Sequence, residues 1–446
     1  MSDERIGRCQ SCNPCSCLSV LTVTFFGMIL SLLGCQSDRE DVLPSLFAES
    51  TDSLFRAVIA DAEQYRLQII YTQIDRDEDN RPAFHDHYFN VDSLTYFNPA
   101  STVKLPLALL SLEKLNALRV EGVDKYTPVV FDSSFSSQTR MHTDSTSENG
   151  LPSIAHFIRK AFLVSDNDAY SRMYEFVGQG TINRKLHEKG FTDTRITHRF
   201  VRMTLEENRH TNAVRFISTE GDILYAQPPA YNEDAFDFSR TEKIGKAHYD
   251  SHDSLVQEPM DFSQRNRMPL KELHGILRAV MFPDAVPRQQ RFDLTDADYK
   301  FLYQYLSQFP GETNYPKYDS TTYFDSYVKF FFRDSLHHKL PEGVRVFNKV
   351  GWAYGFMTDA SYVADFRNGV EYMLSATLYV NSDSVLNDNL YDYATVSHPF
   401  LYELGRIIYQ HEIKRERKFV PDLGDFRVVY ERRNDDGRPV VRDVEN

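Results

Sequence analysis

Cysteine is absent from the chain after residue 35. All five cysteines lie at or before that position, so the remaining residues cannot form a disulfide, use a catalytic cysteine or bind zinc through cysteine ligands. The 14 histidines include no H-E-x-x-H motif, a pattern typical of zinc proteases. The run His85-Asp86-His87 offers ligands for a stray metal at most. We therefore expect no metal and no cofactor, and a metalloenzyme is the less favoured interpretation.

Positive charge is also scarce. The 446 residues contain 50 lysines and arginines against 64 aspartates and glutamates, which gives a net charge of −14, and no basic block occurs. Because nucleic-acid binding depends on clustered positive charge, an acidic chain of this kind is not expected to bind nucleic acid. No internal repeat is present, so a repeat architecture is not expected.

The first 35 residues predict export from the cytoplasm. Arg5 and Arg8 precede an apolar run over 18–33, which ends in Leu-Leu-Gly-Cys at Cys35. This pattern is typical of a secretion signal, and its ending resembles the lipobox of bacterial lipoproteins, in which the cysteine is acylated. An uncleaved membrane anchor is the alternative, since the run approaches spanning length. We expect a lipid-anchored, extracytoplasmic protein of the cell envelope, on the outer membrane or the periplasmic face.

Hydrophobic periodicity predicts helices and strands along the rest of the chain. The expected helices lie at 42–65, 101–118, 154–163, 170–177, 270–281, 295–309 and 399–410. The expected strands lie at 67–74, 88–91, 344–350, 361–366 and 372–380. Asn368-Gly369 between the last two strands is a strong hairpin signal, because glycine and asparagine tolerate the positive φ of a tight turn.

This order of elements predicts one α+β domain over 45–412. Its antiparallel sheet is assembled from both chain ends, with helices on its faces, and an all-helical subdomain lies between. Residues 36–44 are expected to be a tether. An insertion or lid is expected around 200–290, where 227–268 are polar and rich in turn formers. The charged tail over 413–446 is expected to be peripheral.

Three short motifs carry the chemistry: Ser101-Thr102-Val103-Lys104, Ser165-Asp166-Asn167 and Lys349-Val350-Gly351. The S-x-x-K pattern alone is weak, since Ser111–Lys114 and Ser326–Lys329 also match it. Ser101, however, follows a proline turn and opens an apolar helix, where backbone N–H groups are free and negative charge is favoured.

Lys104 lies one helical turn after Ser101 and therefore on the same face. A serine hydroxyl is a poor nucleophile until a base takes its proton. A buried lysine beside a second cation loses its own proton more easily, and Lys349 can be that cation. The alternative for each motif is ordinary helix capping by Ser101 or by the Ser165 loop.

The three motifs, in this order, resemble the set found in class A β-lactamases and penicillin-binding proteins. The resemblance covers roughly 45–200 and 290–412 and implies their fold. It implies catalytic roles in acyl transfer for four residues: Ser101 as nucleophile, Lys104 as base, Ser165 as proton relay and Lys349 as substrate anchor. It also implies that three residues bind the substrate: Asn167, Gly351 and Trp352. The backbone N–H groups of Ser101 and Trp352 would form the oxyanion hole, and Asp166 would brace its loop.

The sequence also departs from this family. Val350 replaces the usual hydroxyl residue of the third motif, and the distance in sequence from Ser165 to Lys349 is longer. No E-x-x-L-N motif is present, and its glutamate activates the deacylating water in the family. Glu206 and Glu207 occur in the neighbourhood without the Leu-Asn pair. A long-lived acyl-enzyme, as in a penicillin-binding protein, is one consequence.

We therefore expect a monomeric serine hydrolase that forms an acyl-enzyme on Ser101 and hydrolyses a β-lactam or a related cyclic or peptide amide. The alternatives are a D,D-peptidase or esterase on the same scaffold, or a non-catalytic surface lipoprotein that binds a cell-wall ligand. The expected partners are a small-molecule or peptide substrate and, through Cys35, a membrane.

Overall fold

The computed structural model describes residues 42–334 and 339–443. The predicted signal over 1–35, its Cys35 and most of the tether lie outside these residues. Within the described ranges, no helix is both long and apolar enough to cross a membrane.

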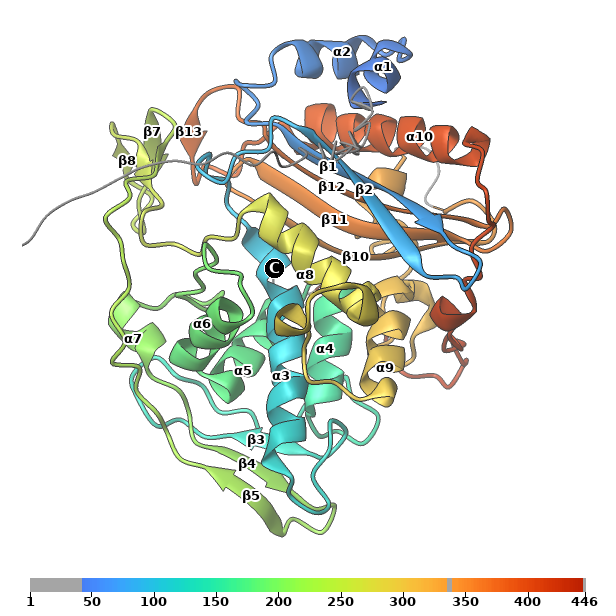
Figure 1. The fold of residues 1–446 in the computed structure, drawn as a ribbon. Coiled ribbons are helices and arrows are strands. Elements are labelled where there is room, and N and C mark those ends of the chain that lie inside the picture. Colours follow the sequence, from blue (N-terminus) through green and yellow to red (C-terminus); the bar gives the residue numbers. More distant parts are fainter. Residues whose placement is uncertain (1–41, 335–338, 444–446) are drawn as a thin grey trace, which may run out of the picture. The chain divides into compact units, whose positions relative to one another are not determined.

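A five-stranded antiparallel sheet joins the two ends of the described chain (Figure 1). Its strands, in spatial order, are β10 (Val344–Ala353), β11 (Phe356–Asp365), β12 (Val370–Tyr379), β1 (Gln68–Arg76) and β2 (Pro82–Phe89). The junction is the β1–β12 pair, in which Gln68 lies opposite Thr377 and Gln73 opposite Tyr372. The predicted α+β fold class, with a sheet built from both chain ends, is confirmed.

Side chains alternate between the two faces of this sheet, and both faces are covered. The inner face of the sheet is the one toward the central helix after Ser101, and the outer face is opposite. On β1, Ile70 and Ile74 belong to the apolar cluster of the inner face, whereas Ile69 and Tyr71 belong to the cluster of the outer face. Because both faces are buried, β11 and β12 have buried residues along nearly their whole length.

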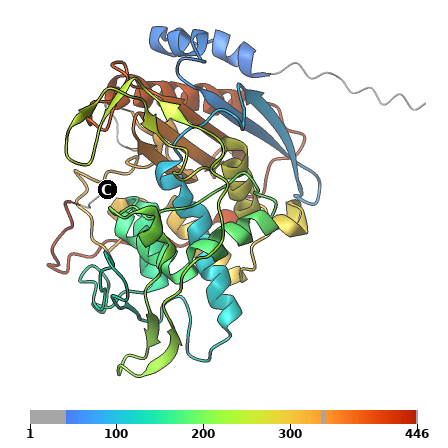
Figure 2. The ribbon, with the colours of Figure 1, turned by 90° about the vertical axis from the view of Figure 1, so that its left-hand side faces the viewer.

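Different helices cover the two faces (Figures 1 and 2). The outer face packs against α10 (His398–Lys414), which also contacts α1 (Val42–Ala48) and α2 (Ser53–Ala60). The inner face packs against α8 (Leu270–Met281).

The helical half is built around α3 (Lys104–Leu118). Its neighbours are α4 (Ile154–Leu163), α5 (Asn167–Val177), α6 (Gln179–Glu188) and α9 (Asp296–Ser307). Buried residues occur on every side of α3, as expected for a helix surrounded by others. The predicted all-helical subdomain is therefore present.

Residues 200–290 contain several short elements and one longer helix. The short helix α7 (Leu205–Arg209) is followed by a hairpin of β4 (Val214–Ile217) and β5 (Ile223–Gln227), which pairs with β3 (Val129–Phe131). Two small sheets follow: β6 (Lys243–Ile244) with β9 (Met260–Asp261), and β7 (Ala247–Tyr249) with β8 (Leu255–Val256) and β13 (Val385–Leu386). The longer helix, α8, packs against the five-stranded sheet, and the insertion around 200–290 stays a prediction.

Two further expectations differ from the structure. The helix expected over 42–65 is divided into α1 and α2, because the Asp52 side chain accepts a hydrogen bond from Phe55 N and begins a new helix. The C-terminal tail is not peripheral: Phe426 is buried in the inner core, and Glu431 accepts hydrogen bonds from Tyr305 and Thr313.

Candidate active site

Ser101 lies in a 3₁₀ turn, η1 (Ala100–Val103), that leads directly into α3. Ala100 has a φ of +42°, and its N–H donates to Asn98 Oδ1 over 2.8 Å, which fixes the entry to the turn. The serine is therefore presented at the start of the central helix, as expected from the proline turn that precedes it.

Lys104 is fully buried beneath Ser101. Its Nζ lies 2.9 Å from Ser101 Oγ and 2.7 Å from Asn167 Oδ1, and it also contacts Ser165 through both the hydroxyl and the carbonyl oxygen. Burial lowers the pKa of Lys104 well below its usual range, the charge of Lys349 lowers it further, and Asp166 opposes both. A neutral amine at this position can accept the proton of Ser101.

The Ser165 loop brings the second motif to the same point. Ser165 has a φ of +66°, a left-handed conformation, and Asp166 then caps α5 by accepting from Ala169 N over 2.7 Å. Lys160 lies 3.4 Å from the Asp166 carboxylate. The Asp166 contacts thus stabilise the strained turn, and the Ser165 hydroxyl points toward Lys104 and Lys349.

Lys349 approaches from the sheet. Its Nζ donates to Ser165 Oγ over 3.0 Å and to Val350 O over 2.8 Å. Burial lowers the pKa of Lys349 to about 7, against the opposing effect of the Asp359 carboxylate. Ser165 Oγ therefore lies between two amines, 3.2 Å from Lys104 Nζ on its other side.

Gly351 lies against the turn that carries Ser101. A Cβ atom at this position would lie 2.5 Å from Pro99 O and 2.9 Å from Ser101 N. Glycine is required because β10 packs directly against the turn that carries Ser101. Its close approach is to the nucleophile turn itself.

A cleft of about 990 Å³ opens over these groups. Ser101, Ser165, Asn167 and Trp352 line it, and Trp352 also packs edge-on against Phe330 with ring centroids 5.7 Å apart. The remaining walls come from segments that the sequence did not point to. The residues that form these walls include Phe200, Arg202, Tyr249, Arg265, Tyr391 and Tyr393.

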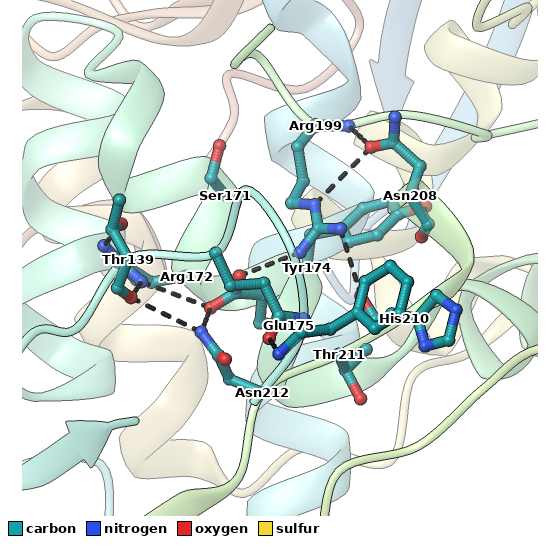
Figure 3. A network of polar contacts seen from close by, with 12 residues as sticks. Thr139, Ser171, Arg172, Tyr174, Glu175, Arg199, Asn208, His210, Thr211 and Asn212 are labelled. Carbon is teal, nitrogen blue, oxygen red and sulfur yellow. Dashed lines mark hydrogen bonds and ion pairs between the residues drawn. The ribbon is translucent and has the colours of Figure 1, made fainter. Parts of the chain in front are cut away.

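A buried ion-pair network holds the wall over 198–212 (Figure 3). The Arg199 side chain is fully buried and lies 2.8 Å from Glu175 Oε1, and it donates to the carbonyl oxygens of Glu207 and His210. Glu175 lies on α5, which begins at Asn167. The network therefore fixes this wall to the helix that carries the second motif; no sequence pattern indicated it.

No glutamate lines the cleft among the described residues. Glu207 instead completes the capping box of α7, accepting from Thr204 N over 2.8 Å. Glu206 lies 3.5 Å from His210, and neither glutamate is part of the cleft wall.

The other two S-x-x-K matches lie away from the cleft. Ser111 donates to Leu107 O over 2.8 Å within α3. Ser326 is fully buried in a turn, and Lys329 donates to Asn348 Oδ1 over 2.6 Å. Only Ser101 among the three serines reaches the cleft.

Comparison with known proteins agrees with this geometry. The sequence model described as the Beta-lactamase enzyme family matches residues 51–222, which include the first two motifs. The resemblance to β-lactamases is therefore confirmed over these residues.

Solved structures also align with the chain at low identity. A β-lactamase from Xanthomonas campestris pv. campestris is 14% identical, with 80% of this chain and 97% of that chain covered and a TM-score of 0.44. A β-lactamase from Sphaerobacter thermophilus is 12% identical, with 81% and 97% covered and a TM-score of 0.42. The protein PBP-A is 12% identical, with 81% and 96% covered and a TM-score of 0.44. No curated protein sequence matches the chain.

Proposed function

We propose that this protein is a serine hydrolase that forms an acyl-enzyme on Ser101 and hydrolyses the C–N bond of a β-lactam or a related cyclic or peptide amide. The observation that supports it most is the 2.9 Å contact between Ser101 Oγ and the buried Lys104 Nζ. Burial and a neighbouring cation favour the neutral amine, which is the form that acts as a base.

Acylation follows from the contacts around Ser165. Lys104 takes the proton of Ser101 as Oγ attacks the amide carbon, and Ser165 passes a proton to the leaving nitrogen. The backbone N–H groups of Ser101 and Trp352 are assigned to the developing oxyanion, a stabilisation that is often the largest single contribution. Lys349 supports the relay through its 3.0 Å contact with Ser165 Oγ.

Substrate recognition is assigned to the rim of the same cleft. Lys349 would bind a carboxylate of the substrate, and Asn167 would bind its acyl-side amide. Val350 is buried in the apolar cluster on the outer face of the sheet and offers no hydroxyl to the cleft. Recognition of a carboxylate therefore depends more on Lys349 here than in relatives with a hydroxyl at this position.

Intact-mass spectrometry of the full-length protein mixed with benzylpenicillin tests the proposal. We expect a penicilloyl adduct in the native protein and in Ser111→Ala, and none in Ser101→Ala. Ser111→Ala is the matched control, because this serine belongs to a second S-x-x-K pattern remote from the cleft. No adduct at any time would exclude penicillin as an acyl donor.

A penicillin-binding D,D-peptidase is the second candidate. The observation that favours it is the lack of a glutamate in the described cleft wall, since water then has no carboxylate base of the usual kind. A persistent adduct together with turnover of a D-alanyl-D-alanine peptide or ester would support it, and a transient adduct would support a β-lactamase. A non-catalytic binding lipoprotein would instead bind its ligand unchanged in Ser101→Ala.

Anchoring at Cys35 in the cell envelope belongs to the same proposal. It is supported by the apolar run that ends in Leu-Leu-Gly-Cys. Membrane fractionation of Cys35→Ala beside the native chain is the test, with metabolic labelling by a fatty acid. Equal labelling of the two proteins would contradict lipidation at this residue.

A further inference from the structure

Hydrolysis of an acyl-enzyme requires a group that accepts a proton from the attacking water. Two aspartates line the cleft, and both shape their own turns: Asp250 Oδ1 accepts from His252 N and Ser254 N, and Asp261 Oδ1 accepts from Ser263 N. Two histidines, His198 and His248, also line the cleft. A neutral histidine is therefore the remaining candidate in the described wall to accept this proton.

His198 has a defined tautomer. Its Nδ1 lies 2.9 Å from Arg199 O, and since a carbonyl oxygen only accepts, Nδ1 carries the hydrogen. The lone pair is then on Nε2, for which no partner occurs among the described residues. Burial, together with the positive charge of Arg265, lowers the pKa of His198 to about 4, against the opposing effect of its hydrogen bond to Arg199 O. At neutral pH the ring is an uncharged acceptor.

The backbone that carries His198 is held rigidly. Its carbonyl oxygen accepts from Tyr170 Oη over 3.0 Å, and its N–H donates to Asn266 Oδ1 over 3.1 Å. The next residue, Arg199, is fixed by the network in Figure 3. A fixed backbone and a fixed tautomer are what a general base needs to meet a water in one geometry.

His198 also lies on the side of the cleft where Lys104 lies. The Phe200 ring is 6.0 Å from the His198 ring between centroids, and its centroid is 5.1 Å from Lys104 Nζ. Tyr170, which holds the His198 carbonyl, lies on α5, the helix that begins at Asn167. His248 has no such connection: it lies on β7 and bonds to Glu258 O over 2.8 Å.

From this placement we infer that His198 is the general base that activates water for deacylation of Ser101; this inference rests on the proposed acyl-enzyme. Nε2 takes one proton as the water oxygen bonds to the acyl carbon. The bond from that carbon to Ser101 Oγ then breaks, and the proton returns to Oγ through the Lys104 amine. The product is the free acid, and the serine, lysine and histidine end as they began.

The test measures formation and lifetime of the benzylpenicillin adduct separately, by intact mass on the full-length protein. His198→Asn retains a donor for Arg199 O but has no basic nitrogen. We expect adduct formation at the native rate and an adduct lifetime about 10²- to 10⁴-fold longer, the range typical of general-base loss. His248→Asn is the matched control, and its adduct is expected to decay at the native rate.

Rescue separates catalysis from structure. Added imidazole should shorten the adduct lifetime in His198→Ala and leave that of the native protein unchanged, which a purely structural role would not produce. A native lifetime in His198→Asn, or equal slowing in His248→Asn, would overturn the assignment. Absence of any adduct in both the native protein and His198→Asn would instead exclude benzylpenicillin as an acyl donor, and this inference with it.

Discussion

Lys349 Nζ lies 3.0 Å from Ser165 Oγ, and that oxygen lies 3.2 Å from Lys104 Nζ. Two amines from opposite halves of the fold thus meet at one hydroxyl, one from the edge strand β10 and one from the central helix α3. Both amines are buried, and for both burial is the main cause of a lowered pKa. The charge of Lys349 also lowers the pKa of Lys104.

Replacing Lys349 with methionine should shift the pH dependence of acylation. The positive charge of Lys349 lowers the pKa of Lys104, so its removal raises that pKa, and the neutral base is then available only at higher pH. The acidic limb of the acylation rate, measured from adduct formation with penicillin, should move to higher pH. Lys114→Met is the control, because Lys114 is also on α3 but bonds to Gln227. An unmoved limb in Lys349→Met would show that the two amines do not interact.

Replacing Gly351 with alanine should disable Ser101 without contacting any substrate. The new Cβ would lie 2.5 Å from Pro99 O and 2.9 Å from Ser101 N, both backbone atoms, so the nucleophile turn must move. A displacement of about 1 Å at a reacting group costs about 100-fold in rate. Gly275→Ala on α8 is the control, because its Cβ would lie 3.4 Å from the nearest atom, Phe191 Cε1. A native acylation rate in Gly351→Ala would contradict the close approach.

The groups that meet at Ser165 could be predicted because each lies in a short local pattern. Ser101 follows a proline turn and opens an apolar helix, and Lys349 lies on a β-rich run that forms β10. The helix expected from residue 295 also follows a local pattern, because Thr295 and Asp298 form a capping box at the start of α9. In each case, neighbours in the sequence determine the local structure.

The cleft walls could not be predicted, because they depend on contacts between distant segments. Tyr249 and Tyr391 come from short segments on either side of the β7–β13 pairing, which the sequence does not mark. Arg199 gave no signal either, since one arginine in a polar stretch is ordinary until Glu175 is placed 2.8 Å away. Gly351 was recognised as a motif residue. Its close approach to the Ser101 turn could not be predicted, because it depends on the packing of β10 against η1.

Replacing Arg199 with methionine should lower both stability and activity. It removes one of the two arginines that pair with the buried Glu175 carboxylate. Breaking a buried ion pair costs up to about 3–5 kcal/mol of unfolding free energy, and Arg172, 3.3 Å from Glu175, offsets part of that loss. The wall over 198–212 should also loosen, so acylation slows even under conditions where the protein is folded. Urea denaturation and adduct formation are the measurements. The exposed pair Arg367–Glu342 gives the control, and Arg367→Met should change neither quantity measurably.

Acid should destabilise the fold through His274, which links α8 to the inner face of the sheet. Its ring nitrogens lie 2.8 Å from Ser375 Oγ and 2.9 Å from Thr72 Oγ1. Burial lowers its pKa to about 3, the charge of Arg278 lowers it further, and Asp86 opposes both.

The unfolded chain binds a proton at this histidine below about pH 6.5, whereas the native ring does not do so until about pH 3. The free energy of unfolding should therefore fall with falling pH across this window, by about 1.4 kcal/mol per pH unit from this group. His274→Gln removes that contribution, so its stability, measured by urea denaturation at a series of pH values, should fall less steeply than that of the native protein. His252→Gln is the control, because that ring is 84% exposed and its loss should leave the slope unchanged. Equal slopes in His274→Gln and the native protein would mean that the ring is already protonated in the fold.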